Sequence, residues 1–167
     1  SLEEIRQYYR QKDDLAEALF DRADRAVLAA SDSAEFRQLN GRDRLRKAIM
    51  TWLHALAPYR HIVIDIFKYK LEPGHIHFQV LGALRVSRTV QWFLEAAGSR
   101  TSHLSRIMEE VGATSVYLSA LIYWLTDTST ESGRTNDFVD RLLRKSETLA
   151  AWVNPHSVIT QPAEQIE

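Results

Sequence analysis

The sequence predicts an all-α protein, and three features carry this prediction. Glycine occurs 6 times and proline 4 times in 167 residues, which is too few breakers for a protein of many short strands and turns. Apolar residues recur at intervals of three and four, the period of an amphipathic helix. The hydrophobic share of 45% and the charged share of 26% are those of a soluble globular domain. We therefore expect one domain of about six helices around a sizeable core.

The first two helices are defined by apolar stripes and by the residues that end them. Residues 13–30 place Leu, Ala, Phe and Val on one face, with Asp and Arg on the other. Ser31 to Ser33 end this helix. After a polar stretch through Gly41 the pattern resumes at Leu45 and runs to Leu56, where Pro58 breaks it.

The next two segments are more apolar. Residues 59–71 are apolar nearly all round, and although their β-branched content makes a strand conceivable, their length favours a buried helix. Pro73 and Gly74 break the chain. Residues 75–97 leave little polar face for solvent, so we expect this long helix at the centre of the domain.

Two long helices complete the domain. Gly98 stops the preceding helix, Thr101 or Ser102 can cap the next one, and that helix runs to about Leu125. The last helix covers residues 134–153, and residues 154–167 form a loose polar tail. Both helices carry more apolar surface than one-sided packing uses, so they either fill one protomer or form a four-helix homodimer interface, and periodicity favours neither. The candidate interface residues are Val111, Leu118, Ile122, Leu125, Phe138, Leu142 and Leu149.

Charge and cysteine content exclude several classes of protein. The 21 Lys and Arg residues against 22 Asp and Glu residues give a formal charge of −1, so no overall basic field attracts nucleic acid. The absence of cysteine excludes disulfides, thiolate metal sites and a cysteine nucleophile. No apolar run reaches the roughly 20 residues that span a bilayer, and the first ten residues do not resemble a signal peptide. We expect a cytoplasmic protein without a membrane partner.

Catalytic motifs are missing from the sequence. It contains no Gly-rich phosphate loop, no G-x-S-x-G turn and no H-E-x-x-H zinc pair. His61 with Asp65, or His75 with His77, could begin a metal site, but neither pair has a third ligand at a readable spacing. We expect no metal, no cofactor and no enzymatic activity.

Arg85 and Arg88 lie inside the most apolar helix. A guanidinium keeps its charge, so a buried one needs a carboxylate, carbonyl groups or an anionic ligand. Each arginine therefore pairs with Asp or Glu of a neighbouring helix or reaches outward to solvent, or Arg85 anchors the acidic head of an apolar ligand. Aromatic residues that could wall such a pocket could equally be plain core. The candidate ligand-binding residues are Trp52, Phe67, Phe78, Leu81, Arg85, Trp92 and Tyr117.

The N-terminal sequence LEEIRQYYRQKDDL resembles the end of the DNA-binding domain of TetR-family transcriptional regulators. Tyr9 and Lys12 fall on the family's aromatic and lysine positions, and Arg6 stands where the family commonly has tyrosine. The resemblance implies that residues 1–12 end a helix-turn-helix domain, that residues 13–153 bind ligand and dimerise, and that Arg6, Tyr8 and Lys12 contact DNA. We expect about 40 residues of the three-helix module to be missing before Ser1.

The C-terminal half is similar to TetR regulators too, and especially to the TetR-fold lipid-binding accessory protein of ubiquinone biosynthesis. The similarity rests on VYLSALIYWLTDTS at residues 116–129 and on residues 135–141. That relative ends in a membrane-binding amphipathic helix, whereas here Val153 is followed by Asn154, Pro155 and a polar tail. The resemblance implies a dimeric regulator that binds operator DNA and responds to a small apolar or amphipathic effector. The alternative is a lipid or isoprenoid carrier without DNA binding.

Overall fold

The computed structural model describes residue 3 and residues 12–70, 76–99 and 103–153, and these ranges contain helices and turns but no strand. Six helices of eleven residues or more confirm the expected all-α class. The elements in chain order are α2 (Lys12–Ser31), α3 (Ala34–Gln38), α4 (Gly41–Leu56), the 3-10 turn η1 (Ala57–Tyr59), α5 (Arg60–Lys70), α6 (Ile76–Ala97), α7 (His103–Thr126), the 3-10 turn η2 (Thr130–Ser132) and α8 (Gly133–Val153).

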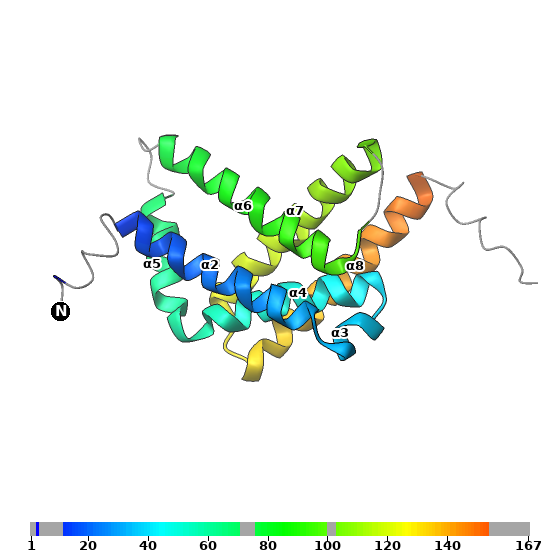
Figure 1. Ribbon diagram of the computed structural model, residues 1–167, viewed down its shortest axis with the longest axis horizontal. Helices are drawn as coiled ribbons and strands as arrows, with labels where there is room; N and C mark the ends of the chain where they lie inside the picture. Colours follow the sequence, from blue (N-terminus) through cyan, green and yellow to red (C-terminus); the bar gives the residue numbers. More distant parts are fainter. Residues whose placement is uncertain (1–2, 4–11, 71–75, 100–102, 154–167) are drawn as a thin grey trace, which may run out of the picture.

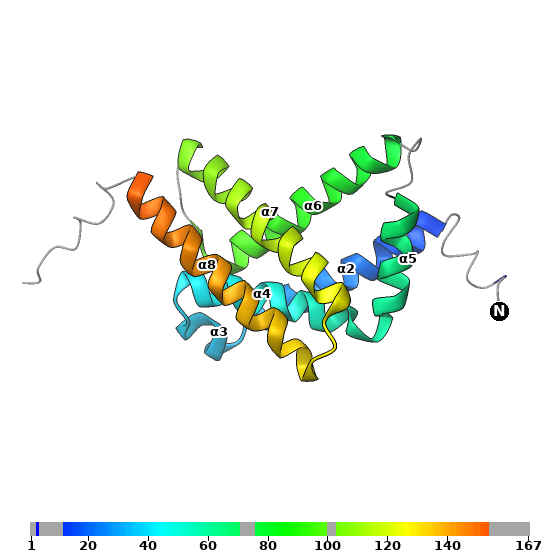
Figure 2. The same ribbon diagram turned by 180° about the vertical axis from the view of Figure 1, so that it is seen from behind.

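The helices are arranged around α4. α2 packs along α4 and also against α6, while α7 lies between α6 and α8. Figure 1 shows α6 and α7 crossing so that their first halves diverge like the arms of a V above α2 and α4. From behind, α8 runs beside α7 and closes the other side of the domain (Figure 2). The arrangement places the first long helix, α2, directly against α6.

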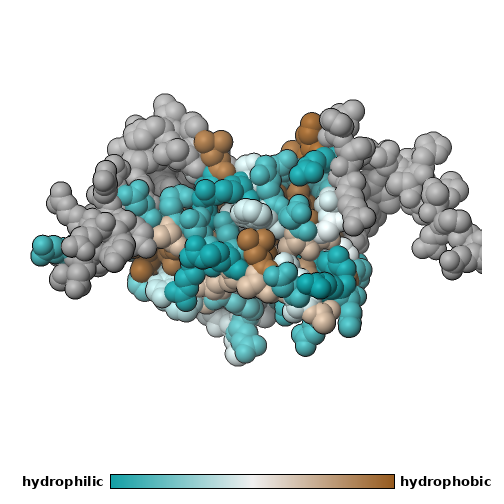
Figure 3. All heavy atoms as spheres, viewed as in Figure 1, coloured by the Kyte–Doolittle hydropathy of each residue, from teal (hydrophilic) through white to brown (hydrophobic). Residues whose placement is uncertain are grey.

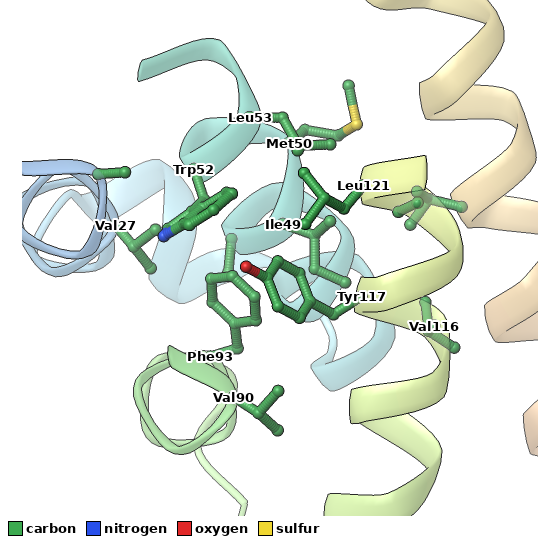
Figure 4. Packing of buried hydrophobic residues seen from close by; sticks show 14 of the residues in the cluster. Val27, Ile49, Met50, Trp52, Leu53, Val90, Phe93, Val116, Tyr117 and Leu121 are labelled. Atoms are coloured by element: carbon green, nitrogen blue, oxygen red, sulfur yellow. The ribbon is translucent and has the colours of Figure 1, made fainter. Parts of the chain in front are cut away.

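Aromatic rings form the centre of the core. Trp52 of α4 is stacked on Phe20 of α2, with ring centroids 5.8 Å apart. Phe93 of α6 and Tyr117 of α7 each meet the Trp52 ring edge-on, at 6.5 and 5.2 Å. Figure 4 shows the rings of Trp52, Phe93 and Tyr117 converging, with Val27, Ile49 and Leu121 around them. Such ring pairs each add about 0.5–1.5 kcal/mol beyond the burial of their area, so this cluster joins four helices.

One helix was not foreseen from the sequence. α3 is only five residues long, too short to show a period, and it lies in the stretch interpreted as polar linker. The Ser33 hydroxyl accepts a hydrogen bond from the Phe36 amide and caps it, while the buried Phe36 ring anchors it to the core. Asn40 caps α4 in the same way through the Asp43 amide.

Two expectations about burial were wrong. α5 was expected to be a buried helix, but Val63 is fully buried whereas Ile62 is exposed and Ile66 and Phe67 are only partly covered. α6 was expected to be apolar all round at the centre, but over residues 84–97, where its side chains are described, one face is buried and the other is exposed, with Leu84 on the exposed side. Both helices pack on the domain from one side, and β-branched or apolar content alone does not tell how many neighbours a helix has.

The corner between α7 and α8 is held by polar contacts. The Asp127 carboxylate accepts hydrogen bonds from the amides and hydroxyls of Ser129 and Thr135, at 2.6–2.9 Å. Burial raises the pKa of Asp127, but these bonds outweigh it and hold the pKa well below its ordinary value. Arg60 of α5 reaches the same corner, donating to the Asp127 carbonyl and to the Ser132 hydroxyl, and its guanidinium lies 4.3 Å above the Trp124 ring centroid.

Candidate functional site

The clearest polar assembly in the described part of the chain is an ion network between α2 and α6, formed by Glu17, Asp21, Asp24, Arg85 and Arg88. The three acids are spaced four and three residues apart, so they lie on one face of α2, and the two arginines are one turn apart on α6. Arg85 contacts all three carboxylates, at 3.2 Å for Glu17 and 2.8 Å for Asp24. Arg88 contacts Glu17 at 3.0 Å and Asp21 at 3.2 Å.

The network has a buried side and an exposed side. The side chains of Arg85 and Asp24 are 8% and 6% exposed, whereas Arg88 is 50% exposed and Glu17 and Asp21 lie between these extremes. A buried guanidinium and a buried carboxylate each need a partner, because an uncompensated charge in the interior costs several kcal/mol. The interior pair and the surface pairs are therefore energetically different parts of one assembly.

Asp24 is the residue at which three helices meet. Its Oδ1 accepts a hydrogen bond from the indole Nε1 of Trp52 in α4 at 2.8 Å and from the Thr89 hydroxyl of α6 at 3.1 Å. Its Oδ2 accepts from Arg85 at 2.8 Å. Burial raises the pKa of Asp24, and Arg85 with the two hydrogen bonds opposes this rise. The carboxylate connects the polar network to the aromatic cluster, since Trp52 belongs to both.

The structure brings together three of the residues proposed for the ligand pocket. Trp52 and Tyr117 pack against each other in the core, and Arg85 joins Trp52 through Asp24. Burial raises the pKa of Tyr117, so its hydroxyl stays protonated. Of the two readings of Arg85, pairing with carboxylates is the one present, because Glu17, Asp21 and Asp24 already surround its charge.

The other pocket candidates are elsewhere or not described. Trp92 is 39% exposed, so in the protomer it is a surface side chain and the expectation of an interior wall was wrong for it. Phe67 is partly buried on α5 and packs against the edge of the core. The side chains of Phe78 and Leu81 lie outside the described residues, as do Arg6, Tyr8 and the Lys12 side chain of the proposed DNA contact.

The outer face of α7 is apolar and exposed. Val111 is 57% and Ile122 68% exposed, and both belong to the interface predicted from the sequence. Ile107 and Met108 of the same helix are also exposed, although no sequence pattern separates them from core residues. Figure 3 shows apolar surface on the arms of α6 and α7 among hydrophilic residues.

The remaining interface candidates divide between surface and core. Leu118, Leu125 and Leu142 are partly buried against the core, and Phe138 stacks on Tyr123 with centroids 4.6 Å apart. The Leu149 side chain lies outside the described residues. Several exposed apolar side chains on one face mark a candidate contact surface, because large contiguous apolar patches are uncommon on monomers.

Sequence reasoning found one half of the ion network and missed the other. Arg85 and Arg88 were recognised as charges in an apolar helix that could pair with Asp or Glu of a neighbouring helix, but Glu17 and Asp21 were not singled out, and Asp24 was noted only for its resemblance to the TetR family. Their spacing at positions i, i+4 and i+7 was the available signal. Thr89, which is fully buried, was not singled out either.

The described residues contain no group of three or more His, Asp or Glu side chains placed to hold a metal ion. None of the helices, where described, combines the length and the apolar character needed to cross a bilayer.

The fold and this pattern of contacts define an all-helical protein of the TetR-like class. The structure matches the crystal structure of a TetR transcriptional regulator from Nitrosomonas europaea ATCC 19718, with a TM-score of 0.76 and 43% sequence identity over 91% of this chain and 80% of that chain. The chain therefore belongs to the TetR family. The COQ9 family model matches residues 86–150, which cover the second half of α6, α7 and most of α8. No curated protein matches the chain.

Proposed function

We propose that the protein is a cytoplasmic transcriptional regulator that binds operator DNA as a homodimer and responds to a small apolar or amphipathic ligand. The observation that carries the proposal is the 43% identity to a TetR transcriptional regulator over most of both chains. The proposed role is binding and signalling, not catalysis. Arg6, Tyr8 and Lys12 would contact the DNA backbone, which positions the protein without reading bases.

The dimer of this proposal is built on α7 and α8. A homodimer interface buries the same patch on both copies, and a standard stable contact buries about 1,200–2,000 Å² in total. The exposed apolar residues Val111 and Ile122 are two turns or more apart on α7, so they provide a stripe that a second copy can cover. Two-fold symmetry would then place the two helix-turn-helix domains at DNA half-sites about 34–36 Å apart.

The ligand of this proposal enters the protein near the aromatic cluster. Trp52, Phe67, Phe78, Leu81 and Tyr117 remain the proposed contacts, because aromatic and aliphatic side chains line sites for apolar ligands. Arg85 can bind an acidic group of the ligand only if that group displaces one of the carboxylates that Arg85 now contacts. This requirement disfavours a simple acidic effector that binds without any rearrangement.

Selection of genomic DNA fragments by the full-length protein tests the regulator proposal. We expect at least one fragment to bind 10³-fold or more tightly than random DNA of equal length, with an affinity that falls as salt rises. Equal binding of all fragments, or no binding at 50 mM salt, would overturn DNA recognition as the function.

A second candidate function rests on the COQ9 family match over residues 86–150. In this alternative the same helical body carries a lipid or isoprenoid and does not bind DNA. Native mass spectrometry and solvent extraction of the purified full-length protein separate the two functions. An apolar passenger in near-stoichiometric amount, together with no preference among DNA fragments, would favour the carrier.

A further inference from the structure

The contact between α2 and α6 consists of solvent-exposed ion pairs on its outer side and of buried polar contacts on its inner side. Within the described residues, Arg85 is the only side chain that meets Glu17, Asp21 and Asp24 together, and Arg88 doubles its contacts to Glu17 and Asp21. The inner side adds the hydrogen bonds that Asp24 accepts from Trp52 and Thr89. Each side of the contact therefore belongs to a different stretch of α2.

The outer pairs lie toward the start of α2 and the inner contacts lie further along it. Glu17 and Asp21 precede Asp24 by two turns and one turn. Exposed ion pairs weaken as salt rises, since the screening length falls from about 10 Å at 0.1 M to about 3 Å at 1 M. A pair that is 6–8% exposed is screened much less. The two ends of the contact must then respond differently to salt.

We propose that this ion network is a graded clamp, in which ionic strength sets how firmly the first half of α2 is docked on α6 while Asp24 and Arg85 keep the second half in place. The proposal assigns a separate role to each arginine. Arg88 belongs to the salt-sensitive outer pairs with Glu17 and Asp21. Arg85 contacts these two residues and also Asp24, so it connects the outer pairs to the inner contacts. Arg85 also covers the Phe20 ring, with its guanidinium carbon 5.6 Å from the ring centroid, so the inner contacts are shielded by an aromatic surface.

Charge around the clamp supports salt control. Three carboxylates face two guanidiniums, which leaves one negative charge in excess. The nearby Glu110 of α7 accepts hydrogen bonds from Ser87 and Gln91 of α6, so it adds negative charge beside the same helix. The excess carboxylates on α2 repel one another more strongly once the outer guanidinium is removed, at low salt above all, because salt screens this repulsion too.

Hydrogen exchange of the full-length protein, followed by mass spectrometry without DNA or added ligand, tests the clamp. The exchange rates are compared for the amides of residues 16–21 and of residues 25–31. Residues 12–15 are left out, because the first four amides of a helix lack intrahelical acceptors and exchange fast in any case. Raising NaCl from 50 to 500 mM should speed exchange of residues 16–21 about two- to fivefold, the effect expected for losing exposed ion pairs. Residues 25–31 should change by less than half of that factor.

Arg88→Gln should produce the same acceleration at 50 mM NaCl and should remove most of the further response to salt. Arg144→Gln is the matched control, because Arg144 is also an exposed arginine, paired with Asp140 at 2.8 Å on α8. This control should leave α2 exchange and its salt response unchanged. Arg85→Lys keeps the charge but cannot reach three carboxylates, so it should accelerate both segments of α2.

Equal acceleration of α2, α7 and α8 in Arg88→Gln would overturn the clamp, because it would mean general destabilisation. An undiminished salt response of residues 16–21 in that variant would overturn it too. The clamp extends the proposed regulator function, because it acts on α2, the helix that follows the proposed DNA-binding segment. The exchange experiment itself contains no DNA. Its failure therefore leaves the DNA-selection result standing, and failure of DNA selection leaves the clamp standing.

Discussion

The two sides of this domain are held by different forces. On the α2 side, charges of opposite sign join two helices, and the buried pair Asp24 and Arg85 is completed by Trp52. On the outer face of α7, Ile107, Met108, Val111 and Ile122 are apolar and more than half exposed in the protomer. The α2 contact is satisfied within one chain, whereas the α7 face is the one proposed to meet a second copy. Substitutions on the two sides should therefore fail in different ways.

The largest expected effect is on assembly. Ile122→Arg places a charge on the apolar face of the proposed interface and should weaken the dimer by about 100- to 1,000-fold. Because Ile122 is 68% exposed in the protomer, the fold itself should persist. Analytical ultracentrifugation measures the change, and circular dichroism checks the helix content.

Leu84→Arg is the matched control for assembly, because Leu84 is 64% exposed but lies on α6. It should remain dimeric. A dimer of unchanged affinity in Ile122→Arg would place the interface elsewhere. Leu118→Arg or Leu142→Arg should also yield monomers, but both residues pack against the core, so those variants lose folding stability as well.

The second effect is on folding stability. Asp24→Ala removes the carboxylate that neutralises Arg85 and leaves the Trp52 indole and the Thr89 hydroxyl without their acceptor. Arg85 keeps Glu17 and Asp21 but loses its one buried partner, and two buried donors lose their acceptor, so the free energy of unfolding should fall by about 3–5 kcal/mol. Urea unfolding at fixed protein concentration measures it. Asp21→Ala, which removes a half-exposed partner of the same arginine, should cost about 1 kcal/mol or less, and equal losses in both variants would contradict the two-sided network.

The third effect depends on pH. Hydrogen bonds hold the folded pKa of Asp127 below its ordinary value, so the stabilisation by its ionised form is complete above the unfolded pKa of about 4. It is lost as pH falls through that value toward the lower folded pKa. Asp127→Asn should cost about 1–3 kcal/mol at pH 7 and should flatten the loss of stability below about pH 5. Asp32→Asn, at an exposed carboxylate, should leave the profile unchanged, and an unflattened acid limb in Asp127→Asn would contradict the assignment.

Most of the helices could be predicted from the sequence because their apolar spacing is local information. The first helix was expected at residues 13–30 and forms Lys12–Ser31, and the last was expected at residues 134–153 and forms Gly133–Val153. α3 escaped detection because one buried residue, Phe36, cannot establish a period. The degree of burial of α5 was wrong because it depends on how many helices pack against it, which no local pattern records.

The candidate site was less predictable for the same reason. Arg85 could be singled out because a charge in an apolar helix needs a partner. Whether this partner is a carboxylate or a ligand could be decided only from the packing of α2 against α6. Asp24 could not be distinguished from other acids of the first helix, although it is buried and they are not. The aromatic residues were equally ambiguous, and the structure places Trp52 inside and Trp92 at the surface.

The smallest predicted effect concerns the turn between α7 and α8. Glu131 has φ 50° and ψ 26°, a left-handed conformation that costs a residue with a Cβ about 1 kcal/mol, whereas asparagine tolerates it better. Its carbonyl contacts the His54 ring nitrogen at 3.0 Å, and this contact does not involve its side chain. Glu131→Asn should therefore raise the free energy of unfolding by about 0.5 kcal/mol and Tm by about 1–2 °C in a thermal melt. Glu131→Ala should give no such gain, since alanine has the same backbone restriction; if both variants gain equally, the side chain of Glu131 and not its backbone is the source of the cost.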